Sequence, residues 1–106
     1  MQTKSKLNVT IEYDTQEKKY KAKPGRLEIK LANDGGVVFK AKGTDVIYFF
    51  PEKNIFNPPI QVVSVGKDKS EPLNLSGMTG EFPYAVFCKT TNDFAEGNSP
   101  PMMIIE

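Results

Sequence analysis

Sulfur supplies the most reactive side chains in the last quarter of this chain. Cys88 is its single cysteine, and Met102 and Met103 follow after a loop. A thiolate and a thioether are soft ligands that suit Cu(I). The chain has no histidine, so it lacks the imidazole ligands on which most transition-metal sites depend. One cysteine also excludes an internal disulfide. The metal chemistry left to consider is therefore Cu(I) held by Cys88 and Met102.

Catalytic chemistry is restricted by the same composition. Without histidine there is neither a Ser-His-Asp triad nor a Cys-His pair. Cys88 would need a lowered pKa to act as a nucleophile, and the neighbouring Lys89 points to the opposite face of an extended strand. Acids such as Asp14 and Glu17 fall in polar turns, where solvated charge is expected. The sequence predicts a protein that is not an enzyme and that has no cofactor.

Length and charge narrow the class of partner. The 106 residues are enough for one domain, spanning 1–106. A net charge of +1 gives no general attraction for nucleic acid. The longest apolar run, 46–50, is too short for membrane insertion. The one basic cluster, between Lys18 and Arg26, is typical of an edge strand protected against aggregation.

The dominant hydrophobic period is two, which indicates half-buried strands. Residues 7–13 and 27–31 alternate clearly between apolar and polar side chains. The run from Val46 to Phe50 is apolar at every position. Such a strand is either covered on both faces or uses its outer face for contact. Further strands are expected at 61–65, 73–75, 84–88 and 102–105.

Turn residues punctuate these strands. The segment from Asn33 to Gly36 tolerates positive φ and predicts a tight hairpin into residues 37–39. Pro83 cannot donate to a ladder, so the regular strand is expected to begin after it. Residues 92–96 are expected to form at most one helical turn. About eight short strands without a sustained helix predict an all-β, antiparallel sandwich.

Two segments carry a resemblance to a known family. Gly80–Cys88 has a glycine, spaced aromatics and a cysteine that ends a strand, and a methionine opens the last strand after Pro100-Pro101. The segment Lys42-Gly43-Thr44-Asp45-Val46-Ile47-Tyr48-Phe49 is also similar to a motif of that family. Together they resemble the cupredoxins, which implies a cupredoxin-like Greek-key sandwich.

The resemblance fails at the copper ligands. The family's first histidine is expected in the stretch 51–59, where the polar candidates are Asn54 and Asn57. The second is expected in 89–101, which contains threonine, asparagine, glycine and proline instead. The resemblance therefore implies the frame of an electron-transfer protein without a type 1 copper site.

Function is expected at one end of this sandwich. If strands 46–50 and 84–88 run toward the same end, their exit loops, around 54–57 and 89–102, meet there. This loop end would present Phe56, Asn57, Phe94 and Met102, with Cys88 beneath them. We expect it to bind a protein or a small ligand, the chain being a monomer or a weak dimer. The alternatives are that Phe56 and Phe94 turn inward to cap the core, or that Cys88 and Met102 bind Cu(I).

The first residues say little about localisation. They lead directly into an alternating strand with no apolar stretch, so no signal peptide is expected in this chain. The family resemblance implies a periplasmic or secreted protein if a leader has been removed.

Overall fold

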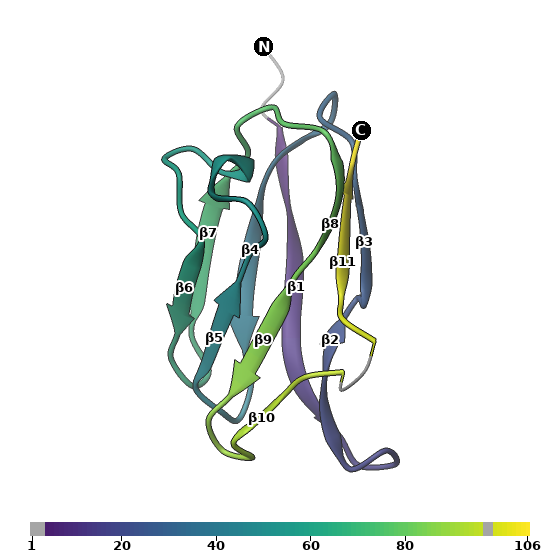
Figure 1. Ribbon diagram of the computed structural model, residues 1–106, viewed down its shortest axis with the longest axis vertical. Coiled ribbons are helices and arrows are strands. Elements are labelled where there is room, and N and C mark those ends of the chain that lie inside the picture. The colour runs from purple at the N-terminus through teal and green to yellow at the C-terminus, as the bar shows by residue number, and fades with distance from the viewer. Residues whose placement is uncertain (1–3, 97–98) are drawn as a thin grey trace.

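The alternating segments form strands throughout the computed structural model, which describes residues 4–96 and 99–106 (Figure 1). The described residues contain eleven strands and one short 3-10 helix. The elements are β1 (Ser5–Asp14), β2 (Lys19–Lys23), β3 (Arg26–Ile29), β4 (Asp34–Ala41), β5 (Val46–Phe49), η1 (Lys53–Ile55), β6 (Val62–Val65), β7 (Ser70–Asn74), β8 (Gly80–Pro83), β9 (Ala85–Cys88), β10 (Asp93–Phe94) and β11 (Met102–Ile105). The all-β prediction is confirmed.

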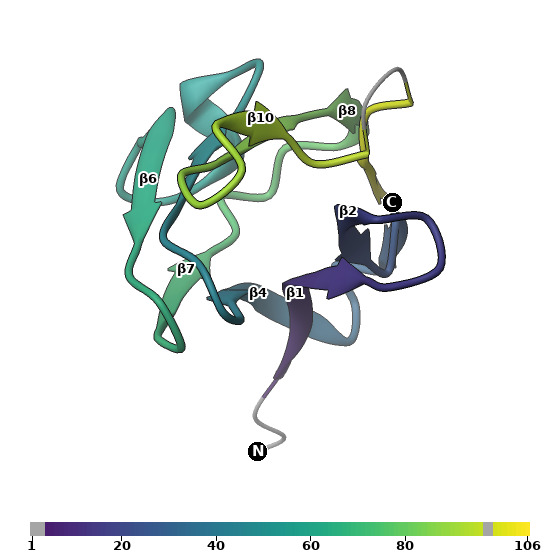
Figure 2. The ribbon, with the colours of Figure 1, turned by 90° about the horizontal axis from the view of Figure 1, so that it is seen from below.

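The strands lie in two layers that face each other (Figure 2). One layer is a sheet with the order β2-β1-β4-β7. The other contains two sheets, β10-β9-β5-β6 and β3-β11-β8. Strands β8 and β9 are consecutive, and the Tyr84 residue between them donates its backbone N–H to the Pro101 carbonyl at 3.0 Å. This junction joins the two sheets of the second layer.

The prediction of a wholly antiparallel sandwich is wrong for two strand pairs. β1 pairs with β4 in parallel, and β3 pairs with β11 in parallel. A parallel pair needs a crossover between its strands. Here β2 pairs with β1, β3 crosses to the opposite layer, and the chain returns as β4 on the other side of β1.

The predicted hairpin at Asn33–Gly36 is also wrong. β3 pairs with β11, whereas β4 pairs with β1 and β7. The turn itself forms, because the Asp34 backbone N–H donates to the Lys30 carbonyl at 2.8 Å and the Asp34 carboxylate accepts from the Lys30 N–H at 2.9 Å. The residues of this turn are compatible with a hairpin and with a connection between the two layers. The chain crosses between the layers because this arrangement buries the apolar sides of the flanking strands.

The strand expected at 84–88 begins after Pro83, as predicted, because β9 starts at Ala85. Pro83 itself lies in the preceding strand β8, opposite Met102. β8 is at the edge of its sheet, where a residue without an N–H donor is tolerated. Residues 93–94 form the short strand β10 against β9, in a segment where at most one helical turn was expected.

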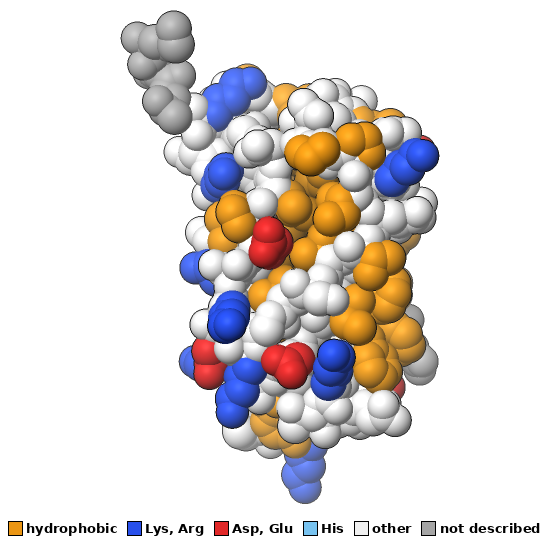
Figure 3. Space-filling view, turned by 90° about the vertical axis from the view of Figure 1, so that its left-hand side faces the viewer, with side chains coloured by type: hydrophobic (Ala, Val, Ile, Leu, Met, Phe, Trp, Pro, Cys, Tyr) orange, Lys and Arg blue, Asp and Glu red, His pale blue; other side chains and the backbone are white. Residues whose placement is uncertain are grey.

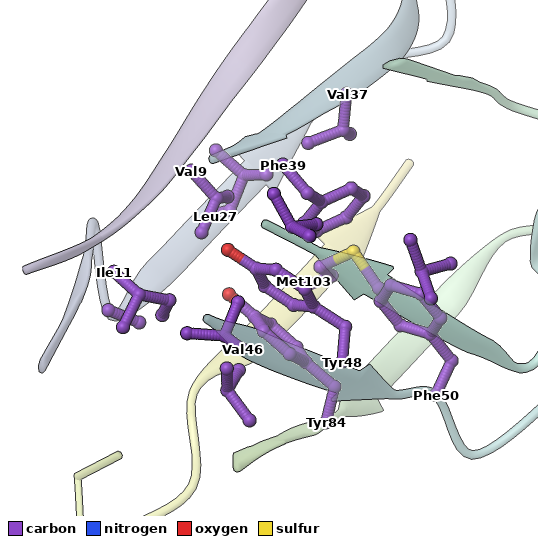
Figure 4. Close-up of a cluster of buried hydrophobic side chains, with 14 of the residues drawn as sticks. Val9, Ile11, Leu27, Val37, Phe39, Val46, Tyr48, Phe50, Tyr84 and Met103 are labelled. Atoms are coloured by element: carbon purple, nitrogen blue, oxygen red, sulfur yellow. The ribbon is translucent and has the colours of Figure 1, made fainter. Parts of the chain in front are cut away.

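Aromatic side chains from both layers fill the core (Figure 4). Phe39 of β4 lies 4.8 Å from Tyr48 and 5.1 Å from Phe50, measured between ring centroids. Tyr84 approaches the same rings, and Met103 is fully buried among the core residues. We call Phe39, Tyr48, Phe50, Phe56 and Tyr84 the aromatic core. It fixes the two layers against each other and so determines which faces stay outside.

Candidate functional site

The predicted loop end does not form, because β5 and β9 are antiparallel. Val46 lies opposite Cys88, and Phe49 lies opposite Ala85. The end of β5, where the 51–59 loop begins, is therefore beside the start of β9, and the loop that follows Cys88 leaves from the opposite end. Antiparallel neighbours exit at opposite ends of a sheet, so the two exit loops do not meet. Residues 97–98 of the predicted site lie outside the described residues.

Phe56 belongs to the core. Its side chain is 1% exposed and its ring lies 4.8 Å from Phe50 and 5.9 Å from Phe39. The adjacent Asn57 is exposed, and its backbone N–H donates to the Asn74 carbonyl at 2.9 Å. The segment is thus anchored inward by an aromatic ring and held against the edge of β7. For Phe56, the alternative of an inward-turned core residue is the one the structure shows.

Cys88 and Met102 are separated along the second layer. Met102 lies opposite Pro83, five residues before Cys88 on the β8–β9 segment. At about 3.3 Å per residue this offset is about 16 Å, so the two sulfur atoms cannot share an ion. The described residues also contain no group of three or more His, Cys, Asp or Glu side chains that could hold a metal. The structure gives the Cu(I) alternative no geometric basis.

The thiol itself is inaccessible. Cys88 is fully buried on the inner side of β9. Burial, with a smaller contribution from the Asp93 carboxylate, raises the pKa of the Cys88 thiol to about 11. A thiol with a raised pKa and no access to solvent is a structural core residue, not a nucleophile.

Phe94 is the one predicted aromatic that stays outside. It is 49% exposed on β10, 5.4 Å from the Phe87 ring and 6.5 Å from the Phe49 ring. These three rings come from β10, β9 and β5, which are neighbours in one sheet. Their positions alternate with the buried residues of the same strands, so they lie on the outer side of the sheet.

The rest of this side is also free of charge. The strand register places Ala85, Phe49 and Val62 in one row, and Phe94, Phe87 and Ile47 in the next. We call the side formed by these six residues the outer face. Phe49 is 38% and Val62 is 51% exposed. In Figure 3 a strip of hydrophobic side chains runs down the right-hand part of the molecule, on the side of this layer.

Two apolar hollows lie where the outer face meets a proline-rich border. One, of about 370 Å³, is lined by Phe49, Phe50, Pro51, Pro83, Tyr84, Ala85 and Pro100. The other, of about 250 Å³, is lined by Tyr84, Ala85, Phe94, Ala95, Pro100 and Pro101. Both are bounded by Ala85, whose small side chain stands opposite the large ring of Phe49. Prolines and short strands hold this border in place, so little order would be lost on binding.

The basic cluster makes a poor alternative site. Lys21 forms an ion pair with Glu17, and the Glu12 carboxylate forms ion pairs with Lys23 at 3.2 Å and with Lys42 at 3.8 Å. Each of these lysines is compensated by a carboxylate. This arrangement suits the expected edge-protecting role, since β2 is the last strand of its sheet. No helix among the described residues has the length and hydrophobicity needed to span a membrane.

No protein-family model matches the chain, and no curated protein matches it significantly.

Sequence reasoning missed most of the outer face, although one signal was available. The run 46–50 is apolar at every position, which allowed either two buried faces or an outer contact face. In the structure only one face of this run is buried: Val46, Tyr48 and Phe50 are buried while Phe49 is exposed. Phe87 and Val62 join it only through strand pairing, for which the sequence has no local signal.

Proposed function

We propose that this chain is a non-catalytic β-sandwich module that binds a protein or a small apolar ligand through its outer face. The observation that carries the proposal is the exposure of Phe49 and Phe94 on an uncharged sheet surface beside two apolar hollows. Aromatic side chains are enriched at the energetic centres of protein interfaces. Contiguous exposed apolar surface on a soluble domain commonly marks an interaction site.

Several features favour binding over catalysis. The chain has no histidine, and its only thiol is buried with a raised pKa. The hollows are bordered by proline, alanine and aromatic side chains without an acid or a base. A surface of this composition recognises apolar groups by shape and burial.

The finer description of the fold is part of the same proposal. A cupredoxin-like Greek-key sandwich without a type 1 copper site is supported by the two facing layers and by Cys88 at the end of β9. The lack of histidine is what removes copper from this description. The proposed binding surface lies on the side of the sheet instead of at a loop end.

Selection from a random peptide library displayed on phage tests the proposed surface. Peptides that bind the wild-type protein would be measured by fluorescence polarisation against Phe49→Ala and Phe94→Ala. We expect each substitution to weaken binding about tenfold or more, because truncated aromatic anchors commonly cost more than 1 kcal/mol. Tyr13→Ala is the matched control, since Tyr13 is 46% exposed on β1 in the other layer.

The proposal fails if the selected peptides bind both outer-face variants as tightly as the wild type. It also fails if binding is lost in Tyr13→Ala but retained in the outer-face variants. Circular dichroism of each variant separates loss of the surface from loss of the fold.

A further inference from the structure

The edges of the two layers are not equally protected, and β6 stands out. β7 contains Pro72, and its Asn74 carbonyl accepts the N–H of Asn57 at 2.9 Å. β2 carries lysines at alternate positions, and β3 carries Arg26 and Glu28. Charges, prolines and covering segments are the devices that keep sheet edges from pairing. β6 reads Val-Val-Ser-Val and has none of them within the strand.

Hydrogen bonding shows which groups of β6 point outward. The Phe50 N–H donates to the Gln61 carbonyl at 2.8 Å, and the register continues through Tyr48–Val63. Bonded pairs alternate along an antiparallel ladder, so Val62 and Ser64 direct their N–H and C=O groups away from β5. β6 is the last strand of its sheet. Within residues 4–96 and 99–106 no other backbone group pairs with Val62 or Ser64.

The edge is reachable from solvent. Val62 is 51% exposed and Ser64 is exposed. β6 and β7 lie together at one side of the molecule (Figures 1 and 2), and this side faces the viewer in Figure 3. An accessible, uncharged edge with unpaired donors and acceptors is a template for another strand.

We propose that β6 pairs with β6 of a second copy of this chain, antiparallel and across a two-fold axis at Val63. In this register Val62 lies opposite Ser64 of the second copy, and Ser64 lies opposite Val62 of the second copy. Both are positions whose backbone groups point outward, so the pairing forms four main-chain hydrogen bonds. The four-stranded sheet β10-β9-β5-β6 thereby becomes one half of a continuous sheet that runs through both copies.

Charge favours a second copy as the occupant. The strand itself is neutral, so two copies meet without like charges at the axis. Continuing the register outward brings Lys67 opposite Pro59 of the second copy and Asp68 opposite Pro58 of the second copy. A closed two-fold contact of this kind is self-complementary and does not propagate into a fibre.

The size of the contact sets its strength. β6 has four residues, and a stable interface buries about 800 Å² per partner. A contact built on one short edge is smaller than that, so the dimer should be weak, with a dissociation constant between about 10 μM and 1 mM. This is the range in which monomer and dimer exchange during a measurement.

Analytical ultracentrifugation of the full chain from about 10 μM to 1 mM tests the proposal, with amide NMR spectra over the same range. We expect the average mass to rise with concentration and the shifts to concentrate on β6. Ser64→Pro removes an outward N–H without removing a bond to β5, and Val62→Lys brings a charge to the axis. Both should raise the dissociation constant about tenfold or more. Thr79→Lys, an equal charge change at an exposed position away from β6, should leave it unchanged.

Two results would overturn the β6 dimer. One is a mass that stays monomeric up to 1 mM, the limit set for weak association. The other is a dimer that Phe94→Ala abolishes while Ser64→Pro and Val62→Lys preserve it, since that pattern means association through the outer face. Because Ser64→Pro and Phe94→Ala address different surfaces, failure of the dimer leaves the binding proposal to its own test.

Discussion

Tyr48 and Tyr84 are two buried phenols whose hydroxyl groups have opposite surroundings. The Tyr48 hydroxyl donates to the Lys40 carbonyl at 2.7 Å, whereas the Tyr84 hydroxyl is buried without a partner among the described residues. Burial raises the pKa of both phenols, so both stay neutral in ordinary buffers. A buried hydroxyl without a partner costs stability, and one with a partner contributes it.

We therefore expect Tyr48→Phe to lower the free energy of unfolding by about 1 kcal/mol. Tyr84→Phe should leave it unchanged or raise it, because no hydrogen bond is lost and the desolvated hydroxyl is removed. Urea denaturation of both variants measures the difference. Equal losses in the two variants would contradict the assignment of a partner to Tyr48 alone.

Cys88 should make stability depend on alkaline pH. Burial raises the pKa of its thiol from 9.0 to about 11. As pH rises, the unfolded chain therefore releases this proton before the folded chain does. The stability that comes from burying the neutral thiol is fully present below about pH 9 and is lost as pH rises toward about 11. Urea unfolding at several pH values should show a steeper fall for the wild type than for Cys88→Ala. Parallel pH profiles for the two proteins would count against a raised pKa.

At the scale of elements, two aromatic residues that the sequence placed in one site behave differently. Phe56 follows η1 and is 1% exposed, while Phe94 in β10 is 49% exposed. The Phe56 ring is packed in the core and therefore holds the short loop that carries it. A ring on the outside of a two-residue strand contributes little to folding.

Phe56→Ala should cost about 3–5 kcal/mol, as for other fully buried phenylalanines. Phe94→Ala should cost less than about 1 kcal/mol, because much of its surface is already in water. Thermal or urea unfolding of this pair compares an inward with an outward ring. A large loss for Phe94→Ala would mean that the outer face is needed for folding, and its role in binding would have to be reconsidered.

At the scale of the whole molecule, the two layers share one aromatic core. Phe39 of β4 contacts Tyr48 and Phe50 from the other layer. Such contacts link sequence-distant strands, so neither layer has a core of its own. Small single domains built in this way usually unfold in one transition.

Phe39→Ala should lower the free energy of unfolding by about 3–5 kcal/mol and keep a single transition. The transitions followed by far-ultraviolet circular dichroism and by tyrosine fluorescence should coincide before and after the substitution. Tyr13→Ala, on the exposed side of β1, provides the control. Separate transitions for the two signals would show that the layers are independent.

The sequence by itself determined the strands and the missing chemistry. Apolar residues at every second position specify β1 and β3 because side chains alternate across a strand. The same sequence contains no histidine, and no fold can supply an absent side chain to histidine-based catalysis or to a type 1 copper site. These conclusions depend only on local pattern and composition.

Only the tertiary structure decided which strands pair and which aromatic residues face out. The turn residues at Asn33–Gly36 were compatible both with a hairpin and with a crossing between layers. The apolar run 46–50 was compatible with a strand that has one buried face and with a strand that has two. Those choices depend on burial summed over strands that are far apart in the chain. The antiparallel β5–β9 register moved Cys88 away from the 51–59 loop, and the aromatic core drew Phe56 inward. Phe94 stayed outside because the register places it opposite Phe87, on the side of the sheet that faces away from the aromatic core.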